Sequence, residues 1–246
     1  MLDERLRARD ASKGAVVFGL PFAHRIGLAA GIARTGIELA GLMALKLGHV
    51  EIGTVTRPSD LCVDRSIIPA DFRVGINFGS SMPGLDENVI EDYAAVMAAA
   101  WHDADFLVAN LSSPRAGRTG DTPGVDDLLA RLRSVQNRLA ARAGQMRPLL
   151  IKISGGNAGD AMPAALVAAR SLAFEGVVLV TPDLDRLKAV RDYVPCGEIV
   201  SVGGVSTQEC IARRLEAGAA LVQYHSAFFS HGIATSGHLS MSQGGK

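Results

Sequence analysis

Residues 149–204 decide the fold, and they read LLIKISGGNAGDAMPAALVAARSLAFEGVVLVTPDLDRLKAVRDYVPCGEIVSVGG. Three apolar runs rich in Val, Leu and Ile, Leu149–Ile153, Val177–Val180 and Ile199–Val202, alternate with longer stretches suited to helices. Strands that are buried on both faces read as continuous apolar runs, and they occur in parallel sheets whose connections are helices. The stretch therefore predicts three consecutive strand–helix units of a parallel sheet.

The same alternation extends outward along the chain. The eight strand candidates are Ile26–Ala30, Val50–Thr54, Val74–Phe78, Asp105–Asn110, Leu149–Ile153, Val177–Val180, Ile199–Val202 and Ala219–Gln223. A right-handed crossover repeated eight times brings the last strand back beside the first, so we predict a closed (β/α)8 TIM barrel; an open doubly wound sheet is the alternative. Residues 55–73 lack a helical period and are predicted to form a loop. We expect one domain over residues 1–232 and a disordered, Gly/Ser-rich tail over 233–246.

Composition narrows the class of ligand. The chain has 246 residues, of which 25 are Lys or Arg and 25 are Asp or Glu. A formal net charge of zero favours neither nucleic acid nor an anionic membrane as partner. No run of about 18 apolar residues predicts a membrane span, and the N-terminus lacks the apolar stretch of a signal peptide. Cys62, Cys196 and Cys210 are few and widely spaced, which predicts no metal site and a cytoplasmic protein. A small-molecule ligand is expected, and homo-oligomerisation is left open.

The carboxyl ends of the predicted strands carry small and polar residues. In a barrel of this type the chemistry lies at these ends, so the side chains should converge on one face. Singly, each has an ordinary explanation, because Asn caps turns and Gly makes room for them. Together they predict a ligand site. In chain order these residues are Ala30, Gly31, Thr54, Asn77, Asn110, Lys152, Thr181, Gly203, Gly204 and Ser226.

Lys152 is the most informative of these residues because it lies inside the run Leu149–Ile153, where a barrel strand is enclosed on both faces. A buried ammonium needs an anionic partner, which is either a bound anion or an Asp or Glu at the barrel mouth. We expect the bound anion. Gly203, Gly204 and Ser226 follow the last two strands, where many barrels hold a phosphate through backbone N–H groups. A phosphate-bearing ligand is predicted.

Six runs in the chain resemble, in order, the flavin-binding barrel of the dihydroorotate dehydrogenases. The runs are IGLAAG at 26–31, VEIGTVT at 50–56, ADFLVANLSSP at 104–114, LIKI at 150–153, VGGV at 202–205 and AGAALVQ at 217–223. The resemblance covers about residues 17–232. It implies FMN across the barrel mouth, with its phosphate on Gly203, Gly204 and Ser226. The ring and ribityl chain would be lined by Ala30, Gly31, Thr54, Asn77, Asn110 and Lys152.

The resemblance also implies two catalytic residues. Ser113 matches the serine that accepts a proton in the quinone-linked branch of the family. Lys152 matches the lysine near the N1/O2 edge of the flavin, where an ammonium favours the negative charge that grows on hydride uptake. Serine is a weak base unaided, so a relay of water or hydroxyl groups is expected to carry its proton away.

The substrate side departs from the family pattern. Arg34, Arg115 and Thr181 stand where the family carries other side chains, and the connections after the second and sixth strands are shortened. Orotate's amide edges lose their partners, whereas two arginines form a cationic clamp suited to a carboxylate or phosphate. A solvated loop residue is the alternative for Arg115. We therefore expect an FMN-dependent oxidoreductase that transfers hydride between flavin N5 and a small anionic substrate.

Three alternatives to this function stay open. The first is an authentic dihydroorotate dehydrogenase of pyrimidine biosynthesis, the second a degenerate barrel that acts as a binding or scaffold subunit, and the third a non-redox enzyme on the same barrel. Among the histidines, His24, His49 and His102 are expected to be structural. His225 replaces a tyrosine of the family beside the predicted phosphate loop, where an imidazole could act in catalysis.

Overall fold

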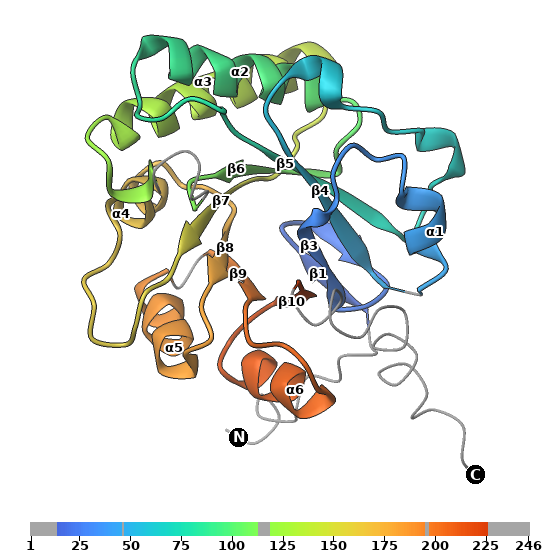
Figure 1. Ribbon diagram of the computed structural model, residues 1–246, viewed down its shortest axis with the longest axis vertical. Helices are drawn as coiled ribbons and strands as arrows, with labels where there is room; N and C mark the ends of the chain where they lie inside the picture. The colour runs from blue at the N-terminus through green and yellow to red at the C-terminus, as the bar shows by residue number, and fades with distance from the viewer. Residues whose placement is uncertain (1–13, 46, 113–118, 195–196, 226–246) are drawn as a thin grey trace.

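Eight parallel strands close into a barrel at the centre of the molecule (Figure 1). The computed structural model describes residues 14–45, 47–112, 119–194 and 197–225. Each strand pairs with the next along the chain, and the last pairs back with the first, which confirms the predicted (β/α)8 barrel. The strands are β3 (Ile26–Ala33), β4 (His49–Val55), β5 (Arg73–Phe78), β6 (Phe106–Asn110), β7 (Leu149–Ser154), β8 (Gly176–Val180), β9 (Glu198–Val202) and β10 (Leu221–Tyr224).

Helices surround the barrel and cover its outer face (Figure 1). They are α1 (Leu39–Met43), α2 (Glu87–Ala100), α3 (Val125–Ala143), α4 (Ala164–Ser171), α5 (Leu184–Tyr193) and α6 (Gln208–Glu216). The connection from β4 to β5 contains only two 3-10 turns in the described chain, η1 (Pro58–Asp60) and η2 (Arg65–Ile67), so the predicted loop is confirmed. After β8 the helix begins almost at once, because the Asp183 carboxylate accepts the backbone N–H groups of Asp185 and Arg186.

A two-stranded hairpin at the amino-terminal end of the barrel was not predicted. It pairs β1 (Ala15–Val17) with β2 (Leu20–Phe22) through Phe18 and Gly19, whose φ angles are +54° and +75°. Two-residue hairpin turns with positive φ at both positions match the twist of the strands. The sequence signal was Gly19 between two short apolar runs. Phe22 of the hairpin packs on His49 and Phe106 inside the barrel, with ring centroids 5.5 and 6.1 Å away.

The barrel interior changes from apolar to polar along the strands. The side chains above this aromatic group are aliphatic and come from five strands; they are Ala29, Val108, Leu150, Val178 and Val200. Because side chains alternate across a strand, the next inward position is two residues later. On β6 and β7 that position holds Asn110 and Lys152. Polar side chains therefore occupy the interior at the carboxyl ends of the strands, and they pack on the aliphatic layer below.

Candidate functional site

Five polar side chains form a buried layer at the carboxyl end of the barrel. They are Glu51, Asn77, Asn110, Lys152 and Gln223, here called the polar layer. Each lies on a different strand, and hydrogen bonds join β4 to β5, β7 and β10 across the interior. The structure thus brings Asn77, Asn110 and Lys152 together as the sequence predicts. It adds Glu51 and Gln223, which sequence reasoning did not select.

Glu51 is the centre of the polar layer. Its Oε1 accepts from Asn77 Nδ2 at 2.7 Å and from Lys152 Nζ at 3.1 Å, and its Oε2 accepts from Gln223 Nε2 at 3.1 Å. The Lys152 and Glu51 side chains are 9% and 0% exposed. The expectation that Lys152 pairs with a bound anion is therefore corrected: the carboxylate of Glu51 partners the ammonium, because barrel closure brings side chains of β4 and β7 together in the interior.

A chain of hydrogen bonds leads from the mouth to Glu51, and every donor points the same way. Ser112 Oγ donates to Asn110 Oδ1 at 2.9 Å, and Asn110 Nδ2 donates to Thr54 Oγ1 at 2.7 Å. Thr54 Oγ1 then donates to Asn77 Oδ1 at 2.7 Å, and Asn77 donates to Glu51. Bonds in such a chain polarise one another, so the carboxylate at its end orients both amides. The amides are held rigidly before any ligand arrives.

Two bulges place predicted residues at the exposed rim above this layer. The register of β3 shifts between Leu28 and Ala33, and that of β4 shifts between Ile52 and Val55. Gly31 and Gly53 lie in these irregular stretches, with φ angles of +107° and +123°. A bulge re-aims the side chains that follow it. Gly31 and Thr54 are exposed as a result, whereas Ala30 is buried beside them.

The paired glycines after β9 both have positive φ angles and form a tight turn at the carboxyl end of the barrel. Gly203 and Gly204 have φ angles of +105° and +64°, and a Cβ on Gly203 would lie 3.2 Å from the Thr181 backbone. Successive left-handed residues can turn their N–H groups into one concavity. The buried Arg214 braces this corner from behind, since its guanidinium donates to the carbonyls of Thr181 and Pro182. The third residue predicted for phosphate, Ser226, lies outside the described residues.

The predicted substrate residues are only partly described. Arg34 is exposed and follows the last residue of β3, at the rim. Thr181 is 1% exposed, and its hydroxyl is used within the fold, since it donates to Gly156 O at 3.1 Å and accepts from Asp183 N at 3.1 Å. Arg115 and the predicted proton acceptor Ser113 lie outside the described residues. The clamp of Arg34 and Arg115 stays a prediction.

His225 follows β10 at the same rim. A Cβ added to Gly31 would lie 3.1 Å from its Nε2, so the imidazole packs against the β3 bulge. Partial desolvation, and then the charge of Lys152, lower the pKa of His225, while Glu51 opposes them. His225 is therefore electrostatically coupled to the polar layer, and its neutral form is favoured near neutral pH.

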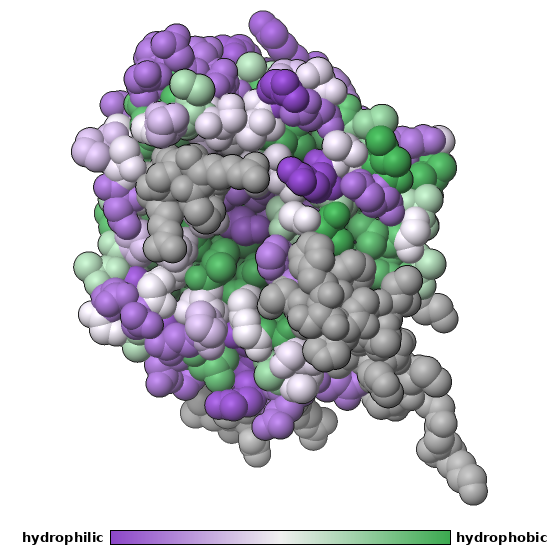
Figure 2. All heavy atoms as spheres, viewed as in Figure 1, coloured by the Kyte–Doolittle hydropathy of each residue, from purple (hydrophilic) through white to green (hydrophobic). Residues whose placement is uncertain are grey.

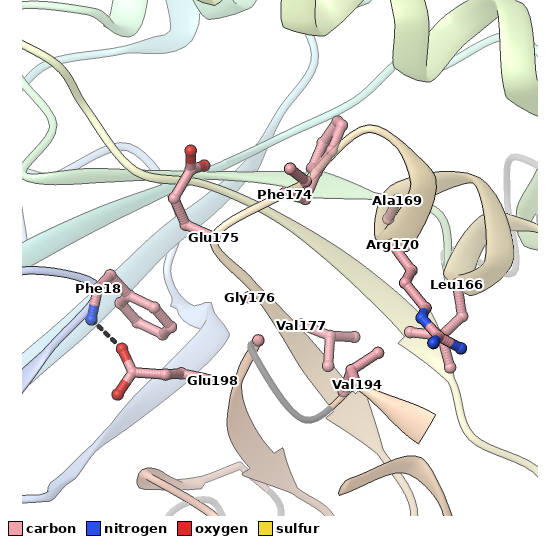
Figure 3. A pocket seen from close by; sticks show the side chains of 12 residues that line it. Phe18, Leu166, Ala169, Arg170, Phe174, Glu175, Gly176, Val177, Val194 and Glu198 are labelled. Atoms are coloured by element: carbon pink, nitrogen blue, oxygen red, sulfur yellow. Dashed lines mark hydrogen bonds between the residues drawn. The ribbon is translucent and has the colours of Figure 1, made fainter. Parts of the chain in front are cut away.

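Two cavities flank the barrel at opposite ends. One of about 190 Å³ lies at the carboxyl ends of β6 and β7, where Asp121, Ser154 and Arg186 line it. The other, of about 560 Å³, lies at the amino-terminal ends of β8 and β9 and is mostly apolar (Figure 3). Two carboxylates line it: Glu198 accepts a hydrogen bond from the backbone N–H of Phe18, and Glu175 accepts one from that of Leu149. Only the first cavity shares a face with the polar layer.

The remaining surface features limit the kinds of ligand. The centre of the face in Figure 2, over the barrel, is hollowed and has hydrophilic residues at its floor. Within the described residues, no three His, Cys, Asp or Glu side chains are placed to hold a metal ion. No helix of the described chain is long and apolar enough to cross a membrane.

The chemistry of the donors can be compared with the requirements of a flavin. An isoalloxazine ring presents carbonyl and ring-nitrogen acceptors on one edge, and FMN adds a terminal phosphate. The layer offers an ammonium and two oriented amides beneath the rim, and the left-handed glycines lie on the same face. The residues that the structure describes therefore fit the group that the sequence resemblance implies.

Comparisons with known proteins give similar sequences and similar folds. No protein-family model matches the chain. A dihydroorotate dehydrogenase (quinone) from Leifsonia xyli subsp. xyli is 31% identical over 93% of this chain and 84% of that protein. Another from Stenotrophomonas maltophilia is 28% identical over 93% of this chain and 83% of its own length. Among solved structures, DHODH from Eimeria tenella in complex with ferulenol superposes with a TM-score of 0.74 at 15% identity, over 95% of this chain and 84% of that one.

Proposed function

The chain belongs to the dihydroorotate dehydrogenase family, and from this premise we propose that it binds FMN above the polar layer and transfers hydride between flavin N5 and a small anionic substrate. The family is one of flavin-dependent oxidoreductases, so the predicted class of enzyme is confirmed. The observation that carries the proposal is the buried ammonium of Lys152, held with two hydrogen-bonded amides at the carboxyl end of the barrel, next to the exposed Gly31 and Thr54. An interaction subunit would not need such a set of groups in its barrel.

Different residues would bind the ring and the phosphate of FMN. Lys152 and Asn110 would hold the polar edge of the ring, with the fully buried Asn77 orienting Thr54 and Glu51 beneath them. Ala30, Gly31 and Thr54 would line the ring from the β3 and β4 bulges. The backbone N–H groups of Gly203 and Gly204, with Ser226, would hold the phosphate. When bound, FMN supplies a two-electron acceptor and donor at N5. Rigid donors of this kind favour charge development without reorganising.

Residues at the rim would transfer the proton and bind the substrate. Ser113 follows Ser112, whose hydroxyl donates into the hydrogen-bond chain. We propose that Ser113 accepts or donates the substrate proton. Arg34 and Arg115 would hold an anionic group, and Thr181, whose hydroxyl is engaged within the fold, would lie buried beneath the substrate. Dihydroorotate is the second candidate substrate, favoured by the names of the relatives.

The domain bounds, the cellular location and the assembly of the protein are also proposals. These are one FMN-binding domain over residues 1–232, a cytoplasmic location and assembly with a second copy. The predicted disorder of residues 233–246 lies outside the described residues. The quinone in the names of the relatives is a property of those proteins, and the electron acceptor of this chain is left unassigned.

The colour of the purified protein tests the proposal. The protein is expected to show the visible absorbance of oxidised flavin, to lose it with dithionite, and to release FMN on denaturation. Bleaching by dihydroorotate without dithionite would identify that substrate and show that the loss of amide partners was overinterpreted. A colourless protein that takes up no FMN when mixed with it would instead support a scaffold or non-redox role.

Ser113→Ala tests the proton step separately. The variant is expected to bind FMN as the wild type does but to be reduced by substrate at least about 100-fold more slowly, since a positioned acid–base group contributes 10²–10⁴-fold. Single-turnover bleaching in a stopped-flow instrument measures the rate. Ser171→Ala, an exposed serine of α4 on the outside of the barrel, is the matched control. Unchanged bleaching in Ser113→Ala would remove the serine from its assigned role.

A further inference from the structure

We propose that Glu51 sets the reduction potential of the bound flavin by offsetting the charge of Lys152. The proposal rests on the proposed function and concerns a residue that the predicted site does not contain. Glu51 is the fully buried carboxylate at the centre of the polar layer, and it lies 3.1 Å from the ammonium of Lys152. Its role would be positioning, because its carboxylate is fully buried and contacts Lys152 and Asn77.

The charges of the layer nearly cancel. Lys152 alone would present one positive charge to the polar edge of the ring, and this charge would favour the anionic reduced flavin. The Glu51 carboxylate sits against it in the apolar interior, where charges interact more strongly than in water. It also repels negative charge on the ring directly. Both effects have the same sign, so Glu51 should lower the reduction potential relative to a barrel that carries the lysine alone.

The hydrogen-bond donors of the layer converge on Glu51. Its carboxylate accepts three hydrogen bonds, from Asn77, Lys152 and Gln223. The chain of donors that begins at Ser112 also ends on this carboxylate. A carboxylate that accepts several bonds is stabilised in its charged form. The charge therefore serves two ends: it orients the amides and it limits the field of Lys152.

The test is the affinity of the cofactor-free protein for oxidised and for reduced FMN. Glu51→Gln keeps the shape of the side chain and removes its charge. At an effective dielectric constant of about 20, two unit charges roughly 10 Å apart change a binding equilibrium on the order of tenfold. Relative to wild type, the variant is expected to favour reduced over oxidised FMN about tenfold more, equal to a rise of about 30 mV for a two-electron couple.

The ratio of the affinities for reduced and oxidised FMN distinguishes the loss of the Glu51 charge from a general loosening of the site. A variant that merely loosens the site weakens both forms of FMN equally, whereas loss of the charge separates them. Glu198→Gln is the matched control, because it removes one carboxylate from the amino-terminal end of the same barrel and is expected to leave the ratio unchanged. If Glu51→Gln does not fold, Glu51→Asp draws the charge back from Lys152 by one methylene and should shift the ratio in the same direction by a smaller factor.

The outcomes are distinct. A rise in potential in the Glu51 variant, without one in Glu198→Gln, supports the inference. An unchanged or lower potential in a flavin-loaded Glu51 variant overturns it and leaves the proposed function intact. Failure of the wild type to bind FMN in either form overturns the proposed function, and the inference with it.

Discussion

Glu51→Gln is expected to lower the free energy of unfolding of the cofactor-free chain by about 3–5 kcal/mol, because it leaves the buried ammonium of Lys152 without its counter-charge. Removing one partner of a buried ion pair costs more than the pair contributed, since the remaining charge is desolvated and unpaired. Urea unfolding at pH 7, followed by circular dichroism, measures the change.

The double variant Glu51→Gln/Lys152→Met supplies the decisive comparison. Replacing both charges by groups of similar volume is expected to recover most of the lost stability. Asp185→Asn, which breaks the exposed Lys188–Asp185 pair, is the control for loss of an ion pair as such and should leave the midpoint unchanged. If Glu51→Gln and Asp185→Asn unfold at the same urea concentration, loss of the Glu51 carboxylate does not destabilise the fold in the way proposed.

Acidification below pH 6.5 is expected to destabilise the fold through His49, by about 3 kcal/mol between pH 6.5 and pH 4. Burial lowers the pKa of His49 from its usual 6.5 to about 3. Neither ring nitrogen has a hydrogen-bond partner among the described residues. Below pH 6.5 His49 is therefore protonated in the unfolded chain but stays neutral in the folded chain. The free energy of unfolding falls by about 1.4 kcal/mol for each pH unit until about pH 3.

The variant His49→Phe isolates this contribution. A phenyl ring can keep the edge-on packing against Phe22 and has no proton to gain. Its unfolding free energy should depend less steeply on pH between 6.5 and 4 than that of the wild type. His102→Gln, at an exposed histidine, should keep the wild-type slope. The same slope in His49→Phe and in the wild type would mean that His49 is not the group responsible.

The barrel itself could be predicted from the sequence because its strands are enclosed on both faces. Continuous apolar runs such as Leu149–Ile153 are typical of parallel strands, and eight of them with helical connections leave few topologies. The hairpin β1–β2 was missed because its strands have only three residues each. Runs of that length carry no readable period.

Several residues of the site could be predicted from the sequence, but the contacts between them could not. Lys152 was recognised as a charge inside an apolar run, and Glu51 in the run 50–56 carries the same signal. What the sequence does not contain is that Glu51 and Lys152, 101 residues apart, meet in the interior of the closed barrel. Closure, and not any local pattern, makes the carboxylate the partner of the ammonium. The bulges at Gly31 and Gly53 likewise depend on pairing with neighbouring strands.

A crystal structure of the protein with FMN tests the central claim most directly. We expect the phosphate at the backbone N–H groups of Gly203 and Gly204, the ring across the rim, and the ammonium of Lys152 still paired with Glu51 while facing the polar edge of the ring. Density for FMN away from the polar layer, for instance in the apolar cavity between Phe18 and Val194, would contradict it.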